Sequence, residues 1–359
     1  MRTLTVDLGD RQYPVYLGQD ILSTFGEVYL SHGLPRITAV VTDRTVASLY
    51  LRELSGVLAH QGISTHPVIM PSGEKQKSLA RTNTIITQFL EAGLTRAGSV
   101  IALGGGVVGD VAGFAAAIYR RGIPIVQVPT TLLAQVESSI GGKVGVNHRT
   151  GKNAFGAFHQ PGLVFSHIKF LTSLPDREIV CGLGEMLKYA LFDEHLFKFF
   201  ETNLDAIRAR DLDVLEESIY RCNDLKVRLV ADDERELKPD GGGRAILNIG
   251  HTLGHALENC SHYRLHHGEA VLVGLRWELA LALRLGLLGR DQYGRISALL
   301  GRVDFSPSLQ NITVDELMAA IYGKNNRARF ILPKKIGEFA TVDDIPPSEV
   351  KTLLLQEKK

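Results

Sequence analysis

The sequence predicts an α/β protein in two parts: a Rossmann-like parallel sheet with helices on its faces, then a mostly α-helical part. Short apolar runs alternate with helical stretches over residues 1–175, as in strands joined by crossover helices. Apolar residues recur at helical spacing over much of 176–359. In this second part His251 and His255 lie one helical turn apart, so their imidazoles share one helix face and point to the same place. We therefore expect an α/β domain over 1–175, a metal-binding helical domain over 176–359, and an active site in the cleft between them.

Composition is typical of a soluble globular protein of two-domain size. The chain has 359 residues, 45% hydrophobic and 22% charged, with a formal net charge of +1. This balance argues against a nucleic-acid or membrane partner. Any cluster of basic residues must be local, and we expect such a cluster to bind a small anionic substrate. The scattered Cys181, Cys222 and Cys260 are typical of a reducing compartment and disfavour thiolate metal ligands. There is no apolar signal region and no apolar stretch of membrane-spanning length, so we expect a cytoplasmic protein.

Four short apolar runs in the first half predict buried parallel strands. They are Ile37–Thr42, Thr65–Met70, Val100–Leu103 and Ile125–Val128, and the alternating N-terminal residues 1–8 predict a further strand. Asp43 follows the first run. An acid at that place binds a ribose hydroxyl or caps the next helix, and the sequence leaves both uses open.

The third run leads into a glycine-rich turn, Leu103-Gly-Gly-Gly-Val-Val-Gly-Asp110, and then into an alanine-rich predicted helix over Asp110–Tyr119. A strand, a glycine turn and a helix N-terminus form a cradle for a pyrophosphate, because the backbone approaches closely and free N–H groups face the anion. The strict G-x-G-x-x-G spacing is absent, and a purely structural turn is the alternative.

Residues 127–153 form the richest polar stretch, with two lysines and many glycines. Their helix and strand propensities are low, so we expect a long functional loop. Together with Arg121 just before it, this loop would surround a phosphate and a carboxylate. Solvated surface charges are the alternative, which the glycine density around Lys143 disfavours.

In the second half, Pro175–Glu178 predicts a helix start. Helical apolar spacing is present in Glu201–Tyr220, Glu269–Leu285 and Val314–Tyr322, and the composition of Lys238–Gly243 indicates a loop.

Four side chains of this half suit a metal ion: Glu185, His251, His255 and His267. Three of them would supply the protein ligands of an open catalytic zinc site, and from spacing alone both His251 and His255 are candidates. Lys188, three residues after Glu185, places an ammonium on the same helix face. Half-buried structural histidines and a surface ion pair are the alternative.

Eight motifs occur in the order found in the 3-dehydroquinate synthase family of the shikimate pathway, which the chain resembles over roughly residues 5–345. The motifs are Pro71-Ser-Gly-Glu-Lys75, Leu103-Gly-Gly-Gly-Val-Val-Gly-Asp110, Gln127-Val-Pro-Thr-Thr-Leu-Leu-Ala-Gln135, Ser138-Ser-Ile-Gly-Gly-Lys143, Gly151-Lys-Asn153, Gly182-Leu-Gly-Glu-Met-Leu-Lys188, Leu247-Asn-Ile-Gly-His251 and His267-Gly-Glu-Ala-Val271.

The resemblance implies an NAD-binding α/β domain, a helical domain, a homodimer, and the cofactors NAD⁺ and a divalent metal, Zn²⁺ or Co²⁺. It implies a lyase that converts 3-deoxy-D-arabino-heptulosonate 7-phosphate, an anionic sugar phosphate, to 3-dehydroquinate and phosphate. The implied steps are transient oxidation by NAD⁺, β-elimination of phosphate, reduction, ring opening and intramolecular aldol closure, with no net redox change.

The same resemblance implies roles for individual residues. Three correspond to metal ligands: Glu185, His251 and His267. Three correspond to catalytic residues: His255, Glu236 and Lys188. The positions that match substrate contacts are Arg121, Glu137, Lys143, Asn153, Lys188, Lys226, Arg244, Asn248 and Lys324. The positions that match NAD contacts are Asp43, Glu74, Lys77, Gly105, Gly106, Asp110, Thr130, Thr131, Lys152, Phe170, Leu171, Thr172 and Ser173.

The chain departs from the family pattern at several positions. Glu137 stands where the family commonly has Asp, and Thr45 where it has Asn near the adenine ribose. About four extra residues separate Glu236 from Arg244, and Lys324 is the best candidate for the family's last substrate lysine. Two other enzymes remain as alternatives. The intact Ser-Ser-Ile-Gly-Gly-Lys motif disfavours another sugar-phosphate cyclase, making an inosose or a valiolone. The substrate-binding lysines disfavour a metal-dependent polyol dehydrogenase that releases NADH.

Overall fold

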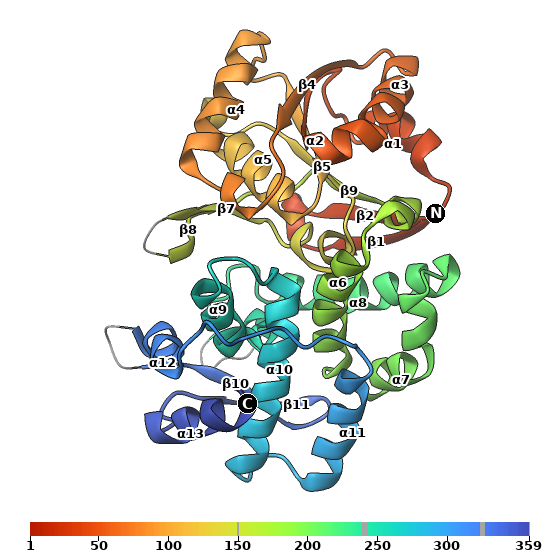
Figure 1. Ribbon diagram of the computed structural model, residues 1–359. Helices are drawn as coiled ribbons and strands as arrows, with labels where there is room; N and C mark the ends of the chain where they lie inside the picture. The colour runs from red at the N-terminus through yellow and green to blue at the C-terminus, as the bar shows by residue number, and fades with distance from the viewer. Residues whose placement is uncertain (149–150, 239–242, 324–326, 359) are drawn as a thin grey trace. The chain divides into compact units, whose positions relative to one another are not determined.

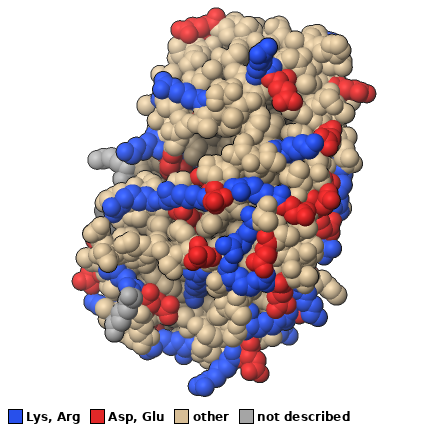
Figure 2. Space-filling view, turned by 45° about the vertical axis from the view of Figure 1, so that its right-hand side comes forward, with Lys and Arg blue, Asp and Glu red and all other residues tan. Residues whose placement is uncertain are grey.

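The computed structural model describes residues 1–148, 151–238, 243–323 and 327–358 (Figure 1). The chain divides into two compact units, and each unit draws on two segments. Unit 1 comprises Met1–Leu174 and Leu215–Arg235, and unit 2 comprises Pro175–Val214 and Glu236–Lys359. Lys and Arg side chains are interspersed with Asp and Glu over the face seen in Figure 2, as the near-zero net charge predicts. Within the described ranges, no helix is both long and apolar enough to span a membrane.

A seven-stranded sheet forms the centre of unit 1, in the order β1-β2-β9-β6-β5-β3-β4. Neighbouring strands are parallel except for the antiparallel pair β1 and β2. The predicted strands and the mostly parallel sheet are therefore confirmed. The strands are β1 (Arg2–Val6), β2 (Tyr13–Gly18), β3 (Ile37–Asp43), β4 (Ser64–Met70), β5 (Ser99–Gly104), β6 (Ile125–Pro129) and β9 (Leu163–His167).

Helices cover both faces of this sheet, because its central strands are apolar on both sides. On β3, Ala39 and Val41 belong to the core that contains Phe89 of α4, whereas Val40 belongs to the core that contains Leu54 of α3. The helices of this unit are α1 (Phe25–Ser31), α2 (Arg44–Val46), α3 (Arg52–His60), α4 (Leu79–Glu91) and α5 (Gly106–Ile118), with short turns η1 (Gly9–Arg11), η2 (Leu22–Thr24), η3 (Ala47–Leu51), η4 (Glu74–Gln76), η5 (Tyr119–Arg121), η6 (Ala134–Ser138) and η7 (Ile168–Ser173).

Residues 127–153 are not the long irregular loop that the sequence predicts. They contain the end of β6, the turn η6, the strand β7 (Lys143–His148) and the start of β8 (Gly151–Phe158), which pairs with β7 in an antiparallel hairpin. A Cβ on Gly145 would lie 2.6 Å from the carbonyl oxygen of Phe155 on the facing strand. The glycines that lower the strand propensity of this segment are thus required by the close approach of the two strands.

The helix α8 (Leu212–Asp232) lies in the second half of the sequence, but most of it belongs to unit 1. Its Val227 and Val230 are buried in an apolar cluster with residues of β1 and β2. This packing explains why residues 215–235 group with the sheet rather than with the other helices of the second half.

The single helical segment predicted over Glu201–Tyr220 is wrong in its extent. The helix α7 (Glu194–Arg208) ends before Arg210, whose φ of 61° is left-handed, and α8 begins after it. Asp211 then accepts hydrogen bonds from the amides at the start of α8, so the chain ends one helix and caps the next within three residues.

Unit 2 is mostly helical and is organised around α10, whose residues are buried on almost all sides. α10 packs against α6, α9, α11 and α13 (Figure 1). The predicted bounds of α12 are confirmed, whereas the small hairpin β10–β11 lies outside the predicted elements. The elements are α6 (Asp176–Ala190), α7, η9 (Gly243–Asn248), α9 (His251–Cys260), α10 (His267–Arg284), α11 (Arg290–Gly301), α12 (Val314–Tyr322), β10 (Phe330–Lys335), β11 (Glu338–Val342) and α13 (Pro347–Glu357).

Candidate active site

The carboxyl ends of β3 and β5 mark the place where the strand order of the sheet reverses. The two strands are parallel neighbours, with Thr42 opposite Leu103, and the chain continues outward to β4 on one side and to β6 on the other. Ligands of open α/β sheets bind outside the carboxyl ends of the strands at such a switch point. Asp43 ends β3 and the turn at Gly104–Gly106 follows β5, so two of the predicted NAD-binding features belong to this edge of the sheet.

The turn after β5 has the geometry of an anion cradle. α5 begins at Gly106, four residues earlier than predicted, and its N-cap Gly105 makes no side-chain cap. A Cβ on Gly105 would lie 2.9 Å from Cγ2 of Thr131, and one on Gly106 would lie 2.9 Å from Oγ of Ser138. Glycine thus leaves room here for the side chains of Thr131 and Ser138, and the helix N-terminus offers N–H groups to an anion. The buried Thr130 lies beside this turn, since its amide donates to the carbonyl of Gly104 at 3.0 Å.

Three other predicted NAD contacts gather around Asp110 on α5. Lys77 forms an ion pair with Asp110, and both side chains are largely buried. Burial raises the pKa of Asp110, the ammonium groups of Lys77 and Lys152 oppose that shift, and Glu74 adds to it. Glu74 in turn accepts a hydrogen bond from Nδ2 of Asn147 at 2.8 Å. The structure thus brings together Glu74, Lys77, Asp110 and Lys152.

The remaining predicted NAD contacts have visible structural partners. Oδ1 of Asp43 accepts from the amides of Thr45 at 2.8 Å and Val46 at 3.1 Å, so helix capping is the use of Asp43 that the structure shows. The residues 170–173 lie in η7, and the hydroxyl of Tyr50 donates to the carbonyl of Phe170 at 3.1 Å.

Glu137 and Lys226, both predicted to contact substrate, form an ion pair within unit 1. Nζ of Lys226 lies 2.8 Å from Oε1 of Glu137, and the two side chains are 2% and 20% exposed. α8 therefore carries a predicted substrate residue back to the sheet unit. The longer side chain of Glu137, compared with the Asp common in the family, reaches Lys226 directly.

The other predicted substrate residues of unit 1 lie at conformationally special positions. Arg121 and Asn153 have left-handed φ values of 72° and 52°. The amide of Asn153 donates to Oδ1 of Asn147 at 3.0 Å, and Lys143 is the first residue of β7. Non-glycine residues with positive φ are uncommon and cluster at functional sites, which makes both positions notable.

In unit 2, α6 carries Glu185 and Lys188 into the interior. Both side chains are 0% exposed, and Nζ of Lys188 lies 2.6 Å from Oε2 of Glu185. Burial opposes ionisation of this carboxyl, but Lys188 and the imidazoles of His251 and His267 lower the pKa of Glu185 well below its ordinary value. The alternative of a surface ion pair is therefore wrong. A buried, charged pair is a weak source of stability and a marker of function.

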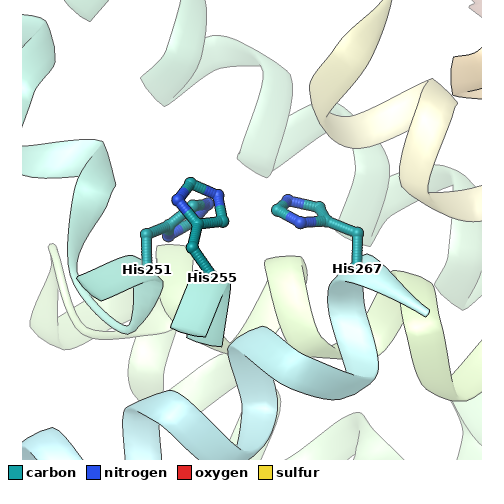
Figure 3. Close-up of side chains that lie close together, drawn as sticks. All are labelled: His251, His255 and His267. Carbon is teal, nitrogen blue, oxygen red and sulfur yellow. The ribbon is translucent and has the colours of Figure 1, made fainter. Parts of the chain in front are cut away.

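Three imidazoles lie close together in this unit (Figure 3), and those of His251 and His267 contact Glu185. His251 and His255 come from α9 and His267 is the first residue of α10, and each has a ring nitrogen within 4.8 Å of a ring nitrogen of the other two. His251 is largely buried and His255 is exposed. The predicted convergence of the histidines is present in the structure.

Hydrogen bonds at Nδ1 orient two of these rings toward Glu185. Nδ1 of His251 lies 3.0 Å from the carbonyl of Ile249, and Nδ1 of His267 lies 3.3 Å from Oε2 of the buried Glu258. When each Nδ1 carries the proton, each Nε2 keeps its lone pair for a metal, as in metal sites where a carboxylate or carbonyl holds the ligating histidine.

The donor atoms fit a small divalent cation. Oε1 of Glu185 lies 3.1 Å from Nε2 of His267 and 3.5 Å from Nε2 of His251. Ligands at 2.0–2.1 Å in a tetrahedral zinc site are about 3.3 Å apart. A carboxylate and two imidazoles at this spacing therefore suit zinc or cobalt. His255 completes a second possible set with His251 and His267.

Two glycines beside these ligands let their helices approach closely. A Cβ on Gly184 would lie 2.0 Å from the carbonyl oxygen of Gly268, and one on Gly268 would lie 1.7 Å from the carbonyl oxygen of Cys181. The amide of Gly268 donates to Sγ of Cys181 at 3.2 Å. The crossing of α6 and α10 thus sets the separation of the adjacent Glu185 and His267.

The other predicted residues of unit 2 lie near the start of α9 in the sequence. Nδ2 of Asn248 donates to Oε1 of Glu236 at 2.6 Å, which brings two predicted site residues together. Glu236 has a left-handed φ of 57°, and Arg244 is buried within η9. Lys324 and most of the inserted loop lie outside the described residues.

Sequence reasoning missed the carboxylate behind His267. Glu258 is three residues after His255 and seven after His251, so helical periodicity places all three on one face of α9. That spacing was the available signal. The need for Gly184 and Gly268 had no comparable signal, because it depends on which helices cross.

Solved structures with the same fold define the class of the protein. The fold matches 2-epi-5-epi-valiolone synthase from Streptomyces hygroscopicus, solved with NAD⁺ and Zn²⁺ bound, with a TM-score of 0.86 and 28% identity over 96% of each chain. A 2-deoxy-scyllo-inosose synthase complexed with carbaglucose-6-phosphate, NAD⁺ and Co²⁺ matches with a TM-score of 0.87 over 99% of each chain, at 24% identity. The chain therefore has the fold of the sugar-phosphate cyclases.

Sequence comparison then gives the family. Residues 67–181 match the 3-dehydroquinate synthase N-terminal family and residues 182–326 match the C-terminal family. The chain is 46% identical to 3-dehydroquinate synthase of Geobacter metallireducens over 349 residues, which cover 95% of this chain and 96% of the relative. It is 41% identical to that of Acinetobacter baumannii, with 99% of each chain covered. The chain belongs to the 3-dehydroquinate synthase family, as its motifs predict.

Proposed function

We propose that this chain converts 3-deoxy-D-arabino-heptulosonate 7-phosphate to 3-dehydroquinate and phosphate, with NAD⁺ and a divalent metal as cofactors. The observation that carries the proposal is the convergence of Glu185, His251 and His267 in a chain of this family. The same family membership supports a cytoplasmic homodimer.

Glu185, His251 and His267 would hold the cation, with Glu258 and the carbonyl of Ile249 orienting the imidazoles. Lewis-acid polarisation of the hydroxyl and carbonyl oxygens of the substrate is the chemistry that a bound divalent cation supplies. We assign His255 outside the ligand set, as an exposed group that moves a proton.

The edge of the sheet at Asp43, the cradle at Gly105–Gly106 and the cluster around Asp110 would bind NAD⁺, whose chemistry is the transient oxidation of a ring alcohol. Amides at the start of α5 would face the pyrophosphate. The neutral balance of acids and lysines around Asp110 suits the ribose and nicotinamide parts of the cofactor.

Basic residues would bind the two anionic groups of the substrate by charge-assisted hydrogen bonds. We assign the phosphate and carboxylate contacts to Arg121, Lys143, Lys226 and Arg244, with Asn153, Asn248, Glu137 and Lys324 completing the set. Glu236 would accept a proton, positioned by its hydrogen bond with Asn248, and Lys188 would act beside Glu185.

Incubation of the purified protein with the heptulosonate phosphate, trace NAD⁺ and zinc tests this function. We expect equal amounts of phosphate and dehydroquinate and no accumulation of NADH. One NADH per substrate would favour a polyol dehydrogenase. Phosphate release from another sugar phosphate alone would favour a different cyclase.

A further inference from the structure

The helix that carries two of the imidazoles begins without a capping side chain of its own. His251 is the first residue of α9, and the preceding Gly250 has a left-handed φ of 79° and no side chain to accept a hydrogen bond. The first N–H groups of a helix have no acceptor within it. At the start of α9 these N–H groups lie in the interior, where Leu253 is buried, so water does not accept their hydrogen bonds. Another element therefore has to supply the acceptors.

Glu278 on α10 supplies those acceptors. Its Oε2 accepts from the amide of Gly250 at 2.6 Å and its Oε1 accepts from the amide of Leu253 at 3.1 Å. Glu278 is 0% exposed. Both carboxyl oxygens are therefore aimed at the first turn of α9, whose amides have no acceptor within the helix.

Close packing of the two helices puts Glu278 within reach. A Cβ on Gly274 of α10 would lie 2.0 Å from the carbonyl oxygen of Gly250. His267, Gly274 and Glu278 follow one another at seven and four residues, so they share one face of α10. The helix that presents His267 thus also holds the start of the helix that presents His251.

We propose that Glu278 is a positioning residue of the metal site. By accepting two amide hydrogens of the first turn of α9, it fixes the rotation of that turn and aims His251 at Glu185 and His267. Glu278 contacts neither metal nor substrate in this role. The inference rests on the proposed metal site, and its effect passes through the backbone of Gly250 and Leu253.

The test compares Glu278→Met, which removes both acceptors at similar volume, with Glu278→Gln, which keeps one. Arg276→Met is the matched control, because Arg276 on the same helix donates instead to three carbonyls at and after the end of α11, those of Leu300, Val303 and Phe305, at 2.7–2.9 Å. For each variant, zinc affinity is measured by competition with a chromophoric chelator, the visible spectrum is recorded with Co²⁺, and stability is measured by urea unfolding.

We expect Glu278→Met to bind zinc roughly ten- to a hundredfold more weakly and to change the cobalt spectrum, as loss of a group that orients metal ligands does. Glu278→Gln should lie between it and the wild type and carries the test if the Met variant does not fold. Arg276→Met should be less stable yet bind zinc as the wild type does.

Two results would overturn the proposal: wild-type zinc affinity and cobalt spectrum in both Glu278 variants, or an equal loss of affinity in Arg276→Met. Failure of the metal site itself has a different signature. If the wild type bound no zinc, or if His251→Ala bound it as tightly as the wild type, the proposed ligand set would be wrong and the role of Glu278 would fall with it.

Discussion

Gly184→Ala should separate α6 from α10 and thereby pull apart two of the proposed metal ligands, Glu185 and His267. The new Cβ would lie 2.0 Å from the carbonyl oxygen of Gly268 and 2.8 Å from its carbonyl carbon. Non-bonded contacts of this kind are favourable near 3.5 Å, so the helices must move apart by about 1.5 Å. Both neighbours are backbone atoms, so no side-chain rotation relieves the contact. Overpacking of a core typically costs about 1–3 kcal/mol.

The same displacement acts on the donor atoms next to the crossing. Oε1 of Glu185 and Nε2 of His267 are 3.1 Å apart. Moving them to roughly 4.5 Å exceeds the spacing of about 3.3 Å between two ligands of one tetrahedral zinc ion. We expect bound zinc to be lost on dialysis and kcat/KM to fall on the order of a hundredfold, since misplacement by about 1 Å has that effect at active sites.

Urea unfolding, metal analysis by mass spectrometry and steady-state kinetics measure the three effects. Gly294→Ala is the matched control, because Gly294 lies on α11 and the new Cβ would meet no atom within 4 Å other than those of its own helix backbone. It should raise the free energy of unfolding by up to about 1 kcal/mol through helix propensity and leave zinc unchanged. If Gly184→Ala kept the stability and the zinc of the wild type, the helix crossing would not set the ligand spacing.

Three further predictions concern charged groups of unit 2. Lys188→Met leaves Glu185 buried without its ammonium and should lower the free energy of unfolding of the zinc-free protein by about 3–5 kcal/mol in urea titrations; an unchanged midpoint would contradict this. Burial raises the pKa of Glu278 to about 8 from 4.5, so the native state keeps a proton that the unfolded state releases. Between pH 4.5 and about 8, the free energy of unfolding of the wild type should fall by about 1.4 kcal/mol per pH unit relative to that of Glu278→Gln. The same pH dependence of unfolding in both proteins would contradict this. His251→Ala should lose zinc and activity together, whereas His255→Ala should keep zinc and lose turnover; equal zinc loss would add His255 to the ligand set.

The sheet was predictable because its strands are buried on both faces. Such strands are continuous apolar runs, and Ile37–Thr42 and Val100–Leu103 stand out for that reason. The strand–glycine–helix order after Leu103 also predicts the cradle, because it places a helix N-terminus directly after a strand. Local patterns of this kind are determined by residues close together in the chain.

Other features depend on contacts between distant segments. Arg210 ends α7 in a left-handed conformation that carries no strong sequence signal in a non-glycine residue. The helix α8 belongs to the sheet unit because its apolar face packs against β1 and β2, a contact between segments far apart in the sequence. The spacing of His251, His255 and Glu258 predicts one shared face of α9, whereas the contact of Glu278 with the start of α9 depends on the packing of α9 on α10.

The charges around the imidazoles favour a cation in this interior. Glu185 and Glu258 are buried carboxylates that lie beside the imidazoles. A buried carboxylate is favoured next to a positive charge. A divalent cation would supply such a charge and would accept the lone pairs that the Nδ1 hydrogen bonds leave at Nε2. A positive centre within reach of the exposed His255 also suits an anionic sugar phosphate. Lys188 lowers the pKa of the buried Glu185 and so keeps it ionised, which is the state that the proposed metal ligand requires.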